Sequence, residues 1–297
     1  MRWLRTAIIC AFLLVGFMIL RFQVFPTPAE PSLLPELPRF EPPSGPMTPI
    51  KGSVMLVGGG SLPDSVFEAY LKLAGGPDAN LVFVPTGWDW GNEGQAERAI
   101  ETWRKRGFNR VTILHTNFRS EANDPAFVKP MTTATAVWFR GGDQTRLIQI
   151  YKGTLVEKEI HRLLERGGAV AGSSAGSMVM SRVTITRAND PIPVREGFGI
   201  LSHVVVDSHF LKRNRIDRLH DVLGEQPGYV GLGVDEGTAA IIEGTSLRIV
   251  GRSMAVVCQL GVPEYRSRSQ VLNPGDTTDL RELTQTALDR GFAGRAK

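Results

Sequence analysis

The chain has 297 residues, of which 22% are charged, and its formal net charge at pH 7 is +4. This length is enough for one large domain or two small ones, with a substantial buried core. Acidic and basic residues are interleaved along the chain, so the charge pattern argues against a nucleic-acid-binding protein.

The first 25 residues are predicted to form a signal segment or a membrane anchor. Arg2 and Arg5 precede an uncharged, largely apolar run over residues 6–20, and Arg21 follows it. Such a run is typical of the core of a signal peptide or of a short membrane span. Because no clear cleavage motif follows, we expect an uncleaved anchor with a cytoplasmic N-terminus. The body would then be exported, periplasmic or extracellular, and it would be secreted if the segment is cleaved.

Three further parts are expected after the anchor. Residues 26–50 are predicted to be an extended linker, because prolines recur there among polar residues and such a segment cannot pack a core. Residues 51–272 are predicted to form the folded domain. Residues 273–297 are expected to form a polar, partly helical tail.

The folded domain alternates short apolar runs with longer amphipathic ones. The apolar runs predict strands over residues 53–57, 80–84, 110–114, 136–139 and 169–171, and the amphipathic runs predict helices over residues 65–73, 93–106, 143–151 and 155–166. This alternation is typical of a parallel sheet with helices on both faces. Residues 238–243 and 246–250 predict an antiparallel hairpin at the sheet edge. We therefore expect an α/β fold, a three-layer sandwich with a mostly parallel sheet and a C-terminal antiparallel edge hairpin.

A serine turn follows the strand at 169–171. Residues 172–176 read G-S-S-A-G and match G-x-S-x-G, a pattern in which a strained strand-to-helix turn exposes a serine. The first amides of the following helix would face the space where an oxyanion develops. Ser174 is therefore the candidate nucleophile, and Ser173 is expected to take no part. A tight turn without chemistry is the alternative interpretation of these five residues.

Three other unusual loops fall at predicted strand ends, where ligand sites lie in parallel sheets. They read G-G-G-S at residues 58–61, P-T-G-W at 85–88 and G-G-D-Q at 141–144. None has the spacing of a phosphate-binding loop or of a dinucleotide fingerprint, so we do not expect a nucleotide site.

A serine nucleophile needs a general base, and His209 is the best placed of the histidines that follow Ser174. His209 comes just after the apolar run 204–206, at another predicted strand end. In contrast, His203 is interpreted as a strand residue and His220 as a solvent-facing helix residue.

The base also needs an acid to orient it, and spacing alone does not identify which residue this is. The candidates are four carboxylates: Glu196, Asp207, Asp235 and Glu236. The last two follow a strand-like run, and alternation would turn one of them inward without indicating which.

Four motifs in one order resemble those of cyanophycinases. They are G-G-D-Q at 141–144, G-S-S-A-G at 172–176, D-S-H-F at 207–210 with the arginines that follow, and G-V-D-E-G-T-A at 233–239. Cyanophycinases and aspartyl dipeptidases are serine peptidases on a class I glutamine amidotransferase-like fold. The resemblance covers roughly residues 52–260. Ser208 stands where cyanophycinases typically have glutamine.

The resemblance implies a catalytic triad in which Ser174 is the nucleophile, His209 the base and Glu236 the acid. Our candidates for the oxyanion hole are the amides of Gly142 and Ala175.

The resemblance also implies a substrate pocket beside the serine, lined by Gln144, Asp207, Arg213, Arg215 and Arg218. Guanidinium groups at this spacing could hold a carboxylate bidentately, while Asp207 could pair with a basic group. A solvated helix face is the alternative interpretation of the three arginines.

Together these observations predict a serine-type exopeptidase, similar to cyanophycinases, that hydrolyses acidic, aspartyl-type peptide bonds through an acyl-enzyme on Ser174. The alternatives are an aspartyl dipeptidase, a non-catalytic module that binds acidic peptides, and an α/β-hydrolase esterase. The esterase fold usually has an H-G-G-G-type loop that this chain lacks.

The expected partners are an acidic peptide substrate and, through the N-terminal segment, a membrane. The sequence leaves open whether the protein is a monomer or a homodimer. No cofactor or metal is expected, because the chain has no metal-ligand spacing and its two cysteines, Cys10 and Cys258, lie in unlike segments.

Overall fold

The computed structural model of the chain describes residues 40–88, 93–186, 192–260 and 268–293. The predicted anchor at residues 1–25 and most of the predicted linker lie outside these ranges. In the described ranges, no helix is both long enough and apolar enough to cross a membrane.

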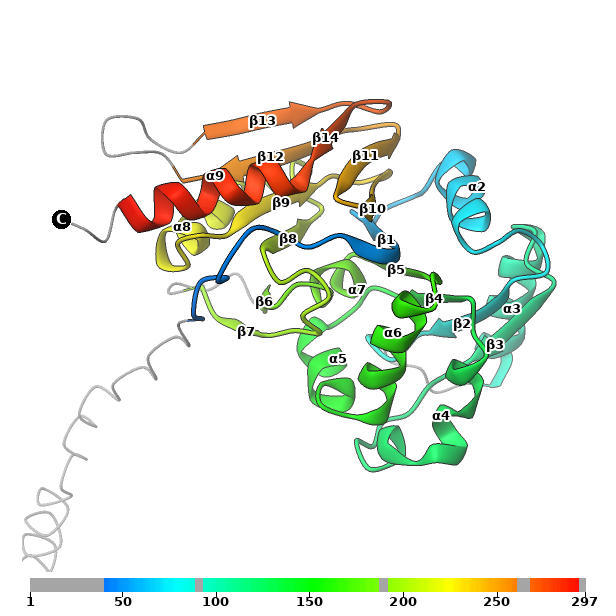
Figure 1. Cartoon of the computed structure of the whole chain (residues 1–297). Helices are drawn as coiled ribbons and strands as arrows, with labels where there is room; N and C mark the ends of the chain where they lie inside the picture. The colour runs from blue at the N-terminus through cyan, green and yellow to red at the C-terminus, as the bar shows by residue number, and fades with distance from the viewer. Residues whose placement is uncertain (1–39, 89–92, 187–191, 261–267, 294–297) are drawn as a thin grey trace, which may run out of the picture. The chain divides into compact units, whose positions relative to one another are not determined.

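A mostly parallel sheet of eight strands forms the centre of the described body (Figure 1). Its order is β14 (Thr277–Asp279), β11 (Ser246–Gly251), β10 (Thr238–Gly244), β1 (Ile50–Val57), β5 (Ala169–Ser173), β4 (Ala136–Phe139), β2 (Asn80–Val84) and β3 (Arg110–Ile113). The five strands from β1 to β3 in this order are parallel, so their carboxyl ends share one edge. This edge carries the serine turn and all three glycine-containing loops noted in the sequence.

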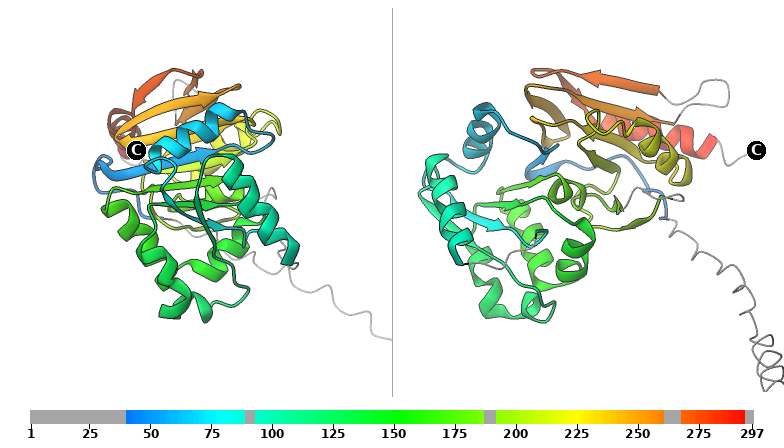
Figure 2. Two further views of the ribbon diagram at one scale, coloured as in Figure 1. Left: turned by 90° about the vertical axis from the view of Figure 1, so that its right-hand side faces the viewer. Right: turned by 180° about the vertical axis from the view of Figure 1, so that it is seen from behind.

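Helices cover both faces of this sheet (Figure 2). One face packs against α2 (Asp64–Leu73) and α3 (Glu93–Lys105), and the other against α4 (Pro125–Thr132), α5 (Gln144–Tyr151) and α6 (Leu155–Glu165). On the first face, the rings of Trp103 and Trp138 meet edge to face with centroids 4.9 Å apart, and both side chains are buried. The expected three-layer α/β fold is confirmed.

The predicted hairpin forms between β10 and β11, but it does not end the sheet. Thr238 pairs with Gly251 and Glu243 with Ser246 in an antiparallel register. Strand β14 then adds to the outer side of β11. The hairpin is therefore an inner part of the sheet, because a strand from the predicted tail covers its edge.

A second sheet, which the sequence analysis did not separate from the first, lies beside it. Its order is β13 (Arg268–Leu272), β12 (Ala255–Gln259), β9 (Val230–Val234) and β8 (Val204–Ser208), with β8 and β9 parallel. Helix α8 (Ile216–Glu225) packs on one face of it and α9 (Leu280–Ala293) on the other. A short pair, β6 (Val183–Ile185) and β7 (Val194–Glu196), completes the strands of the described residues.

The segment expected to be a polar tail belongs to the folded body over residues 273–293. It supplies β14 and α9, and Leu280, Thr284, Ala287 and Leu288 are buried. These positions are spaced by four, three and one, so they form one stripe of a helix. The Thr284 hydroxyl also accepts a hydrogen bond of 3.1 Å from the amide of Met47. The stripe is short and lies among charged residues, which is why composition alone suggested a tail.

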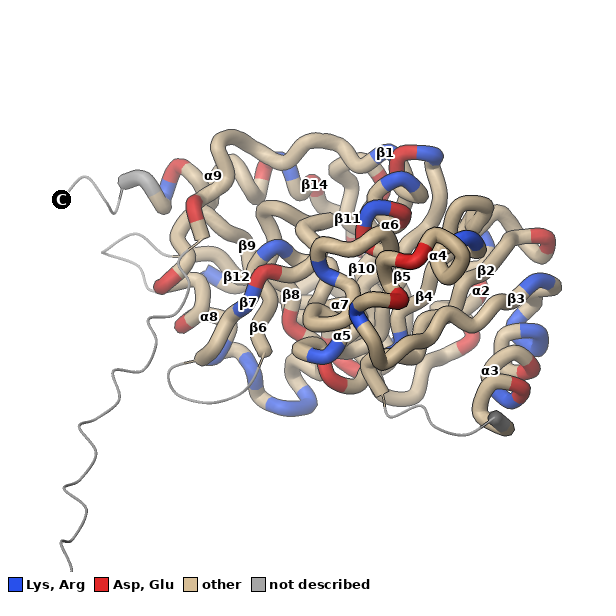
Figure 3. The backbone as a smooth tube through the Cα atoms, turned by 90° about the horizontal axis from the view of Figure 1, so that it is seen from below, with Lys and Arg blue, Asp and Glu red and all other residues tan. Residues whose placement is uncertain are grey.

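Charged residues of both signs are distributed along the described chain rather than gathered by sign, as Figure 3 shows. Helix α3 alone carries several of each sign. This distribution agrees with the interleaved charges of the sequence.

Replacing Leu280 by alanine should destabilise the whole body, because a leucine that is fully buried leaves a cavity when it is truncated. We expect the free energy of unfolding to fall by about 2–5 kcal/mol in urea titrations. Arg281→Ala, at the exposed neighbour, should change it by less than about 0.5 kcal/mol. Equal stability of the two variants would mean that α9 is not part of the core.

Candidate active site

Ser174 lies at the end of β5, in a turn that the backbone can make only under strain. Its φ is 54° and its ψ is −119°, values that a residue with a side chain rarely adopts. The turn is held by hydrogen bonds from the amide of Ser174 to the carbonyl of Val57, at 2.8 Å, and from the amide of Ser177 to the carbonyl of Ser174, at 2.9 Å. The predicted serine turn is therefore present, with helix α7 (Ala175–Met178) after it.

The two glycines of the motif make room for this turn. A Cβ on Gly172 would lie 2.1 Å from the carbonyl oxygen of Gly176, and a Cβ on Gly176 would lie 2.3 Å from the carbonyl oxygen of Phe139. Any side chain at either position would therefore collide with backbone. The glycines allow strand and helix to meet closely beneath Ser174.

His209 comes from the second sheet, one residue after β8. It also has a positive φ, 48°, and its amide donates a 2.8 Å hydrogen bond to the carbonyl of Gly58, the residue that follows β1 of the large sheet. The next residue, Phe210, is fully buried with its ring over Gly233, where a Cβ would lie 2.3 Å from the ring. Burial of this ring fixes the chain immediately beyond the histidine.

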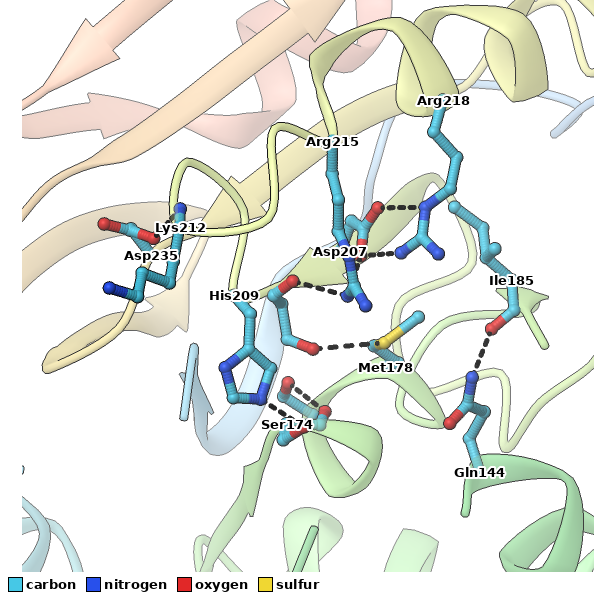
Figure 4. Close-up of polar contacts among 12 residues, drawn as sticks. Gln144, Ser174, Met178, Ile185, Asp207, His209, Lys212, Arg215, Arg218 and Asp235 are labelled. Atoms are coloured by element: carbon cyan, nitrogen blue, oxygen red, sulfur yellow. Dashed lines mark hydrogen bonds and ion pairs between the residues drawn. The ribbon is translucent and has the colours of Figure 1, made fainter. Parts of the chain in front are cut away.

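The hydroxyl of Ser174, the ring of His209 and the carboxylate of Glu236 form a chain of hydrogen bonds. Ser174 Oγ is 2.8 Å from His209 Nε2, and His209 Nδ1 is 2.6 Å from Glu236 Oε1 (Figure 4 shows the first two residues). A carboxylate can only accept, so Nδ1 carries the proton and Nε2 is left to accept from the serine. Burial lowers the pKa of His209, although its hydrogen bond to Glu236 opposes this shift.

Asp235, the neighbour of Glu236, has a different set of partners. Its carboxylate accepts hydrogen bonds from the amides of Leu211 and Lys212 and from the hydroxyl of Ser253, at 2.8–3.1 Å. Burial of this carboxyl would raise its pKa, but hydrogen bonds from backbone amides and Ser253 outweigh burial and lower it. Asp235 thus fixes the segment after His209, and Glu236 is the residue that reaches the ring.

The glycine loop, residues 58–60 after β1, packs directly against His209 and Glu236. A Cβ on Gly59 would lie 2.5 Å from the imidazole carbon Cε1, and a Cβ on Gly60 would lie 2.7 Å from Oε2 of Glu236. The carbonyl of Gly59 also accepts a 2.9 Å hydrogen bond from the amide of Gly237. From the sequence this loop is expected only to lie at a ligand site. Three consecutive glycines at a strand end were the signal for such close packing.

The loop after β4 lies on the other side of Ser174. A Cβ on Gly141 would lie 2.9 Å from Cβ of Ser174, and one on Gly142 would lie 1.9 Å from the carbonyl oxygen of Gly87. Gly142 has a φ of 144°. In the described part of the chain, the amides of Gly142 and Ala175 donate to no other group. These two amides therefore remain the candidates for the oxyanion hole.

Asp207, Arg215 and Arg218 form a buried ion cluster beside this site (Figure 4). The Asp207 side chain is 0% exposed, and it accepts hydrogen bonds of 3.0 Å from Arg215 Nη1 and 2.9 Å from Arg218 Nε, together with one from Arg218 Nη2. Burial raises the pKa of Asp207, and both arginines oppose that shift. Arg218 therefore holds this carboxylate bidentately and Arg215 adds a single hydrogen bond, but the carboxylate is the chain's own and not that of a substrate.

The remaining predicted pocket residues have individual partners. The side-chain amide of Gln144 donates to the carbonyls of Ile185 and Thr186 at 3.0 and 2.8 Å. Arg213 is exposed, and its positive charge lowers the pKa of His209 after the larger effect of burial. Ser208 is buried with its hydroxyl 3.2 Å from the sulfur of Met178.

Three other candidates lie elsewhere. The carboxylate of Glu196 is half exposed, in β7, and pairs with Lys152 at 3.6 Å. His203 is buried just before β8 and hydrogen-bonds to the carbonyl of Gly45. His220 lies in α8, 3.2 Å from the hydroxyl of Ser269.

Comparison with known proteins assigns this arrangement to a family. The model of peptidase family S51 matches residues 54–250, which is more than half of the chain and includes Ser174, His209 and Glu236. The chain belongs to peptidase family S51. It is a serine-type exopeptidase, as predicted from the four motifs.

Curated relatives of this S51 peptidase include several cyanophycinases. That of Synechococcus elongatus is 28% identical over 260 residues, which covers 78% of this chain and 80% of the relative. That of Nostoc is 31% identical over 170 residues, covering 54% and 57% of the two chains.

Solved structures of two peptidases resemble this fold. A peptidase from an acI-B1 Actinobacterium aligns with a TM-score of 0.62 at 25% identity, over 77% of this chain and 97% of that one. A putative peptidase E from Listeria monocytogenes aligns with a TM-score of 0.50 at 16% identity, over 68% and 99%, and so shares the fold.

Replacing Gly59 by alanine should lower the peptidase activity about 100-fold, because the new methyl group displaces the imidazole of His209 from Ser174. The matched control is Gly75→Ala. Gly75 has nearly the same φ, 100° against 102°, but a Cβ there meets nothing within 4 Å. Both variants place a methyl group on a residue with a positive φ near 100°, so measuring kcat and thermal stability in parallel isolates the effect of the contact with His209. Equal activity of the two variants would contradict the role of the glycine loop.

Proposed function

We propose that this S51 peptidase hydrolyses acidic, aspartyl-type peptide bonds through an acyl-enzyme on Ser174. The observation that carries the proposal is the continuous hydrogen-bonded chain from Ser174 through His209 to Glu236, with distances of 2.8 and 2.6 Å. Its first member has the strained backbone of a nucleophile turn.

The first half of the proposed reaction forms the ester. Ser174 Oγ attacks the carbonyl carbon of the scissile bond, while its proton passes to His209 Nε2. Glu236 stabilises the resulting imidazolium through Nδ1. When the tetrahedral intermediate collapses, the C–N bond breaks and the leaving amine takes the proton from His209.

The second half releases the acyl group. A water molecule gives a proton to His209 Nε2 and attacks the ester carbonyl. Collapse of this second intermediate breaks the bond to Ser174 Oγ, which recovers the proton from His209, and the carboxylic acid product departs. In both halves the negative oxygen would be held by the amides of Gly142 and Ala175, which have no other acceptor in the described chain.

The charge around the site supports an acidic substrate. Asp207 pairs with Arg215 and Arg218 and leaves Arg213 without a carboxylate at ion-pair distance in the described chain. The positive charge of Arg213 reaches His209, whose pKa it lowers, and it would attract a carboxylate-bearing peptide to this side of the site. Relatives of the chain carry the name cyanophycinase, and we propose that cyanophycin or a related aspartyl peptide is the substrate.

Hydrolysis of a β-Asp-Arg polymer and of α-Asp-X dipeptides should depend on Ser174. We expect Ser174→Ala to reduce kcat by about 10⁴- to 10⁶-fold with unchanged folding, because the nucleophile is lost. Ser173→Ala, next to it on β5, should retain near-native activity. Cleavage of the polymer would identify a cyanophycinase, and cleavage of the dipeptides alone an aspartyl dipeptidase. Turnover by Ser174→Ala at the native rate would exclude the mechanism.

The pH profile of kcat/KM should reflect His209, which must be neutral to accept a proton. Because burial lowers its pKa, the acid-side midpoint should lie below about 6.5, with full activity above that pH and loss as the pH falls. Glu236→Gln removes a carboxylate that raises this pKa, so the midpoint should move still lower. The kcat of this variant should drop by about 10²- to 10⁴-fold, because a carboxylate no longer holds His209 in the tautomer that is protonated on Nδ1. A native midpoint above 6.5 would be incompatible with this account.

A further inference from the structure

Arg140 is a partly buried cation that has no anionic partner in the part of the chain that the structure describes. It follows β4 directly, and in the described ranges its guanidinium group has neither a hydrogen-bond acceptor nor a carboxylate at ion-pair distance. Burial lowers its pKa, so the protein carries the cost of desolvating this charge. Arg215 and Arg218, by contrast, are compensated by Asp207.

The aromatic ring of Trp88 supports this cation. The guanidinium carbon lies 5.1 Å from the ring centroid, at a distance typical of a cation–π contact. Trp88 is 52% exposed, which is unusual for so large an apolar side chain. The pair thus presents a cation on an aromatic surface, an arrangement that suits a carboxylate ligand.

The position of Arg140 relates it to the nucleophile. Phe139, the residue before it, pairs with Gly172 of β5, and the residue after it is Gly141, which lies against Ser174. Trp88 follows Gly87, whose carbonyl oxygen lies against Gly142. Arg140 and Trp88 therefore flank the loop that carries one of the proposed oxyanion amides.

The strand order tells which part of a substrate would meet this pair. The sheet runs β1, β5, β4, β2, so the glycine loop and His209 lie on one side of Ser174, and Arg140 and Trp88 lie on the other. His209 must protonate the leaving amine, so the leaving group belongs on its side. The acyl residue of the substrate then extends toward Arg140.

We propose that Arg140, oriented by Trp88, determines specificity by binding the free carboxylate of the substrate's acyl residue. This inference rests on the proposed function. The acyl residue of an aspartyl dipeptide offers such a carboxylate in either linkage, from its side chain when α-linked and from its main chain when β-linked. In a β-Asp-Arg polymer both of its carboxyl groups are in amide bonds, so the inference applies to aspartyl dipeptides. The planar guanidinium fork would hold both carboxylate oxygens.

Binding to the full chain carrying Ser174→Ala tests this proposal without requiring turnover. The probes are Asp-Leu in its α- and β-linked forms, each beside the analogue whose free acyl-side carboxylate is an amide, measured by calorimetry. At least one linkage should bind about 10- to 100-fold more tightly than its amide analogue. Adding Arg140→Gln should reduce this preference to about threefold or less, and Arg140→Lys, which keeps the charge but not the fork, should retain part of it.

Arg106→Gln is the control. The Arg106 guanidinium lies 4.1 Å from the ring centroid of Phe67 and pairs with Asp64, and it comes between α3 and β3, at the opposite end of the parallel strands from Ser174. This variant should leave the preference unchanged. A preference for carboxylate that persists in Arg140→Gln, or its absence in the parent chain, would overturn the proposal. Hydrolysis of the same peptides by the chain with Ser174 intact is scored separately, so failure of the proposed function is distinguishable from failure of the role of Arg140.

Discussion

The contact between the glycine loop and the residues His209 and Glu236 is the constraint on which the site depends. Ser174 belongs to the large sheet, whereas His209 and Glu236 follow strands of the second sheet. The two sheets meet where the carbonyls of Gly58 and Gly59 accept hydrogen bonds from the amides of His209 and Gly237. A methyl group at residue 59 or 60 would overlap the imidazole or the carboxylate. The absence of side chains in this loop therefore sets the distance between nucleophile and base.

The arrangement of charge separates two kinds of arginine around this junction. Arg215 and Arg218 form ion pairs with the fully buried Asp207, which offsets part of their charge. They therefore contribute to the structure around His209 as well as to the attraction of a substrate. Breaking such a buried cluster is costly, because it leaves an uncompensated charge. Among the described residues Arg140 has no such partner, and its guanidinium group lies over the ring of Trp88, on the opposite side of Ser174. This is the arginine that we propose for a ligand carboxylate.

Sequence patterns over a few residues predicted the structural features that depend on interactions between neighbouring residues. The parallel strands, the flanking helices and the strained turn at Ser174 follow from apolar periodicity and glycine spacing, and all are present. The choice of Glu236 over Asp235 came from the family resemblance, because alternation alone left both open. The second sheet, the packing of α9 and the pairing of Asp207 with Arg215 and Arg218 depend on contacts between segments far apart in the chain. Short apolar runs do not encode their pairing partners, so the sequence could not separate the sheets.

The central claim is that Ser174 is an activated nucleophile, and its reaction with a fluorophosphonate tests it most directly. Peptide mapping by mass spectrometry after labelling would locate the adduct, since only a serine whose proton can be withdrawn by a neighbouring base reacts quickly. The account predicts a single adduct on Ser174 that is lost in His209→Ala. An adduct on another serine, or a native protein that does not react, would contradict it.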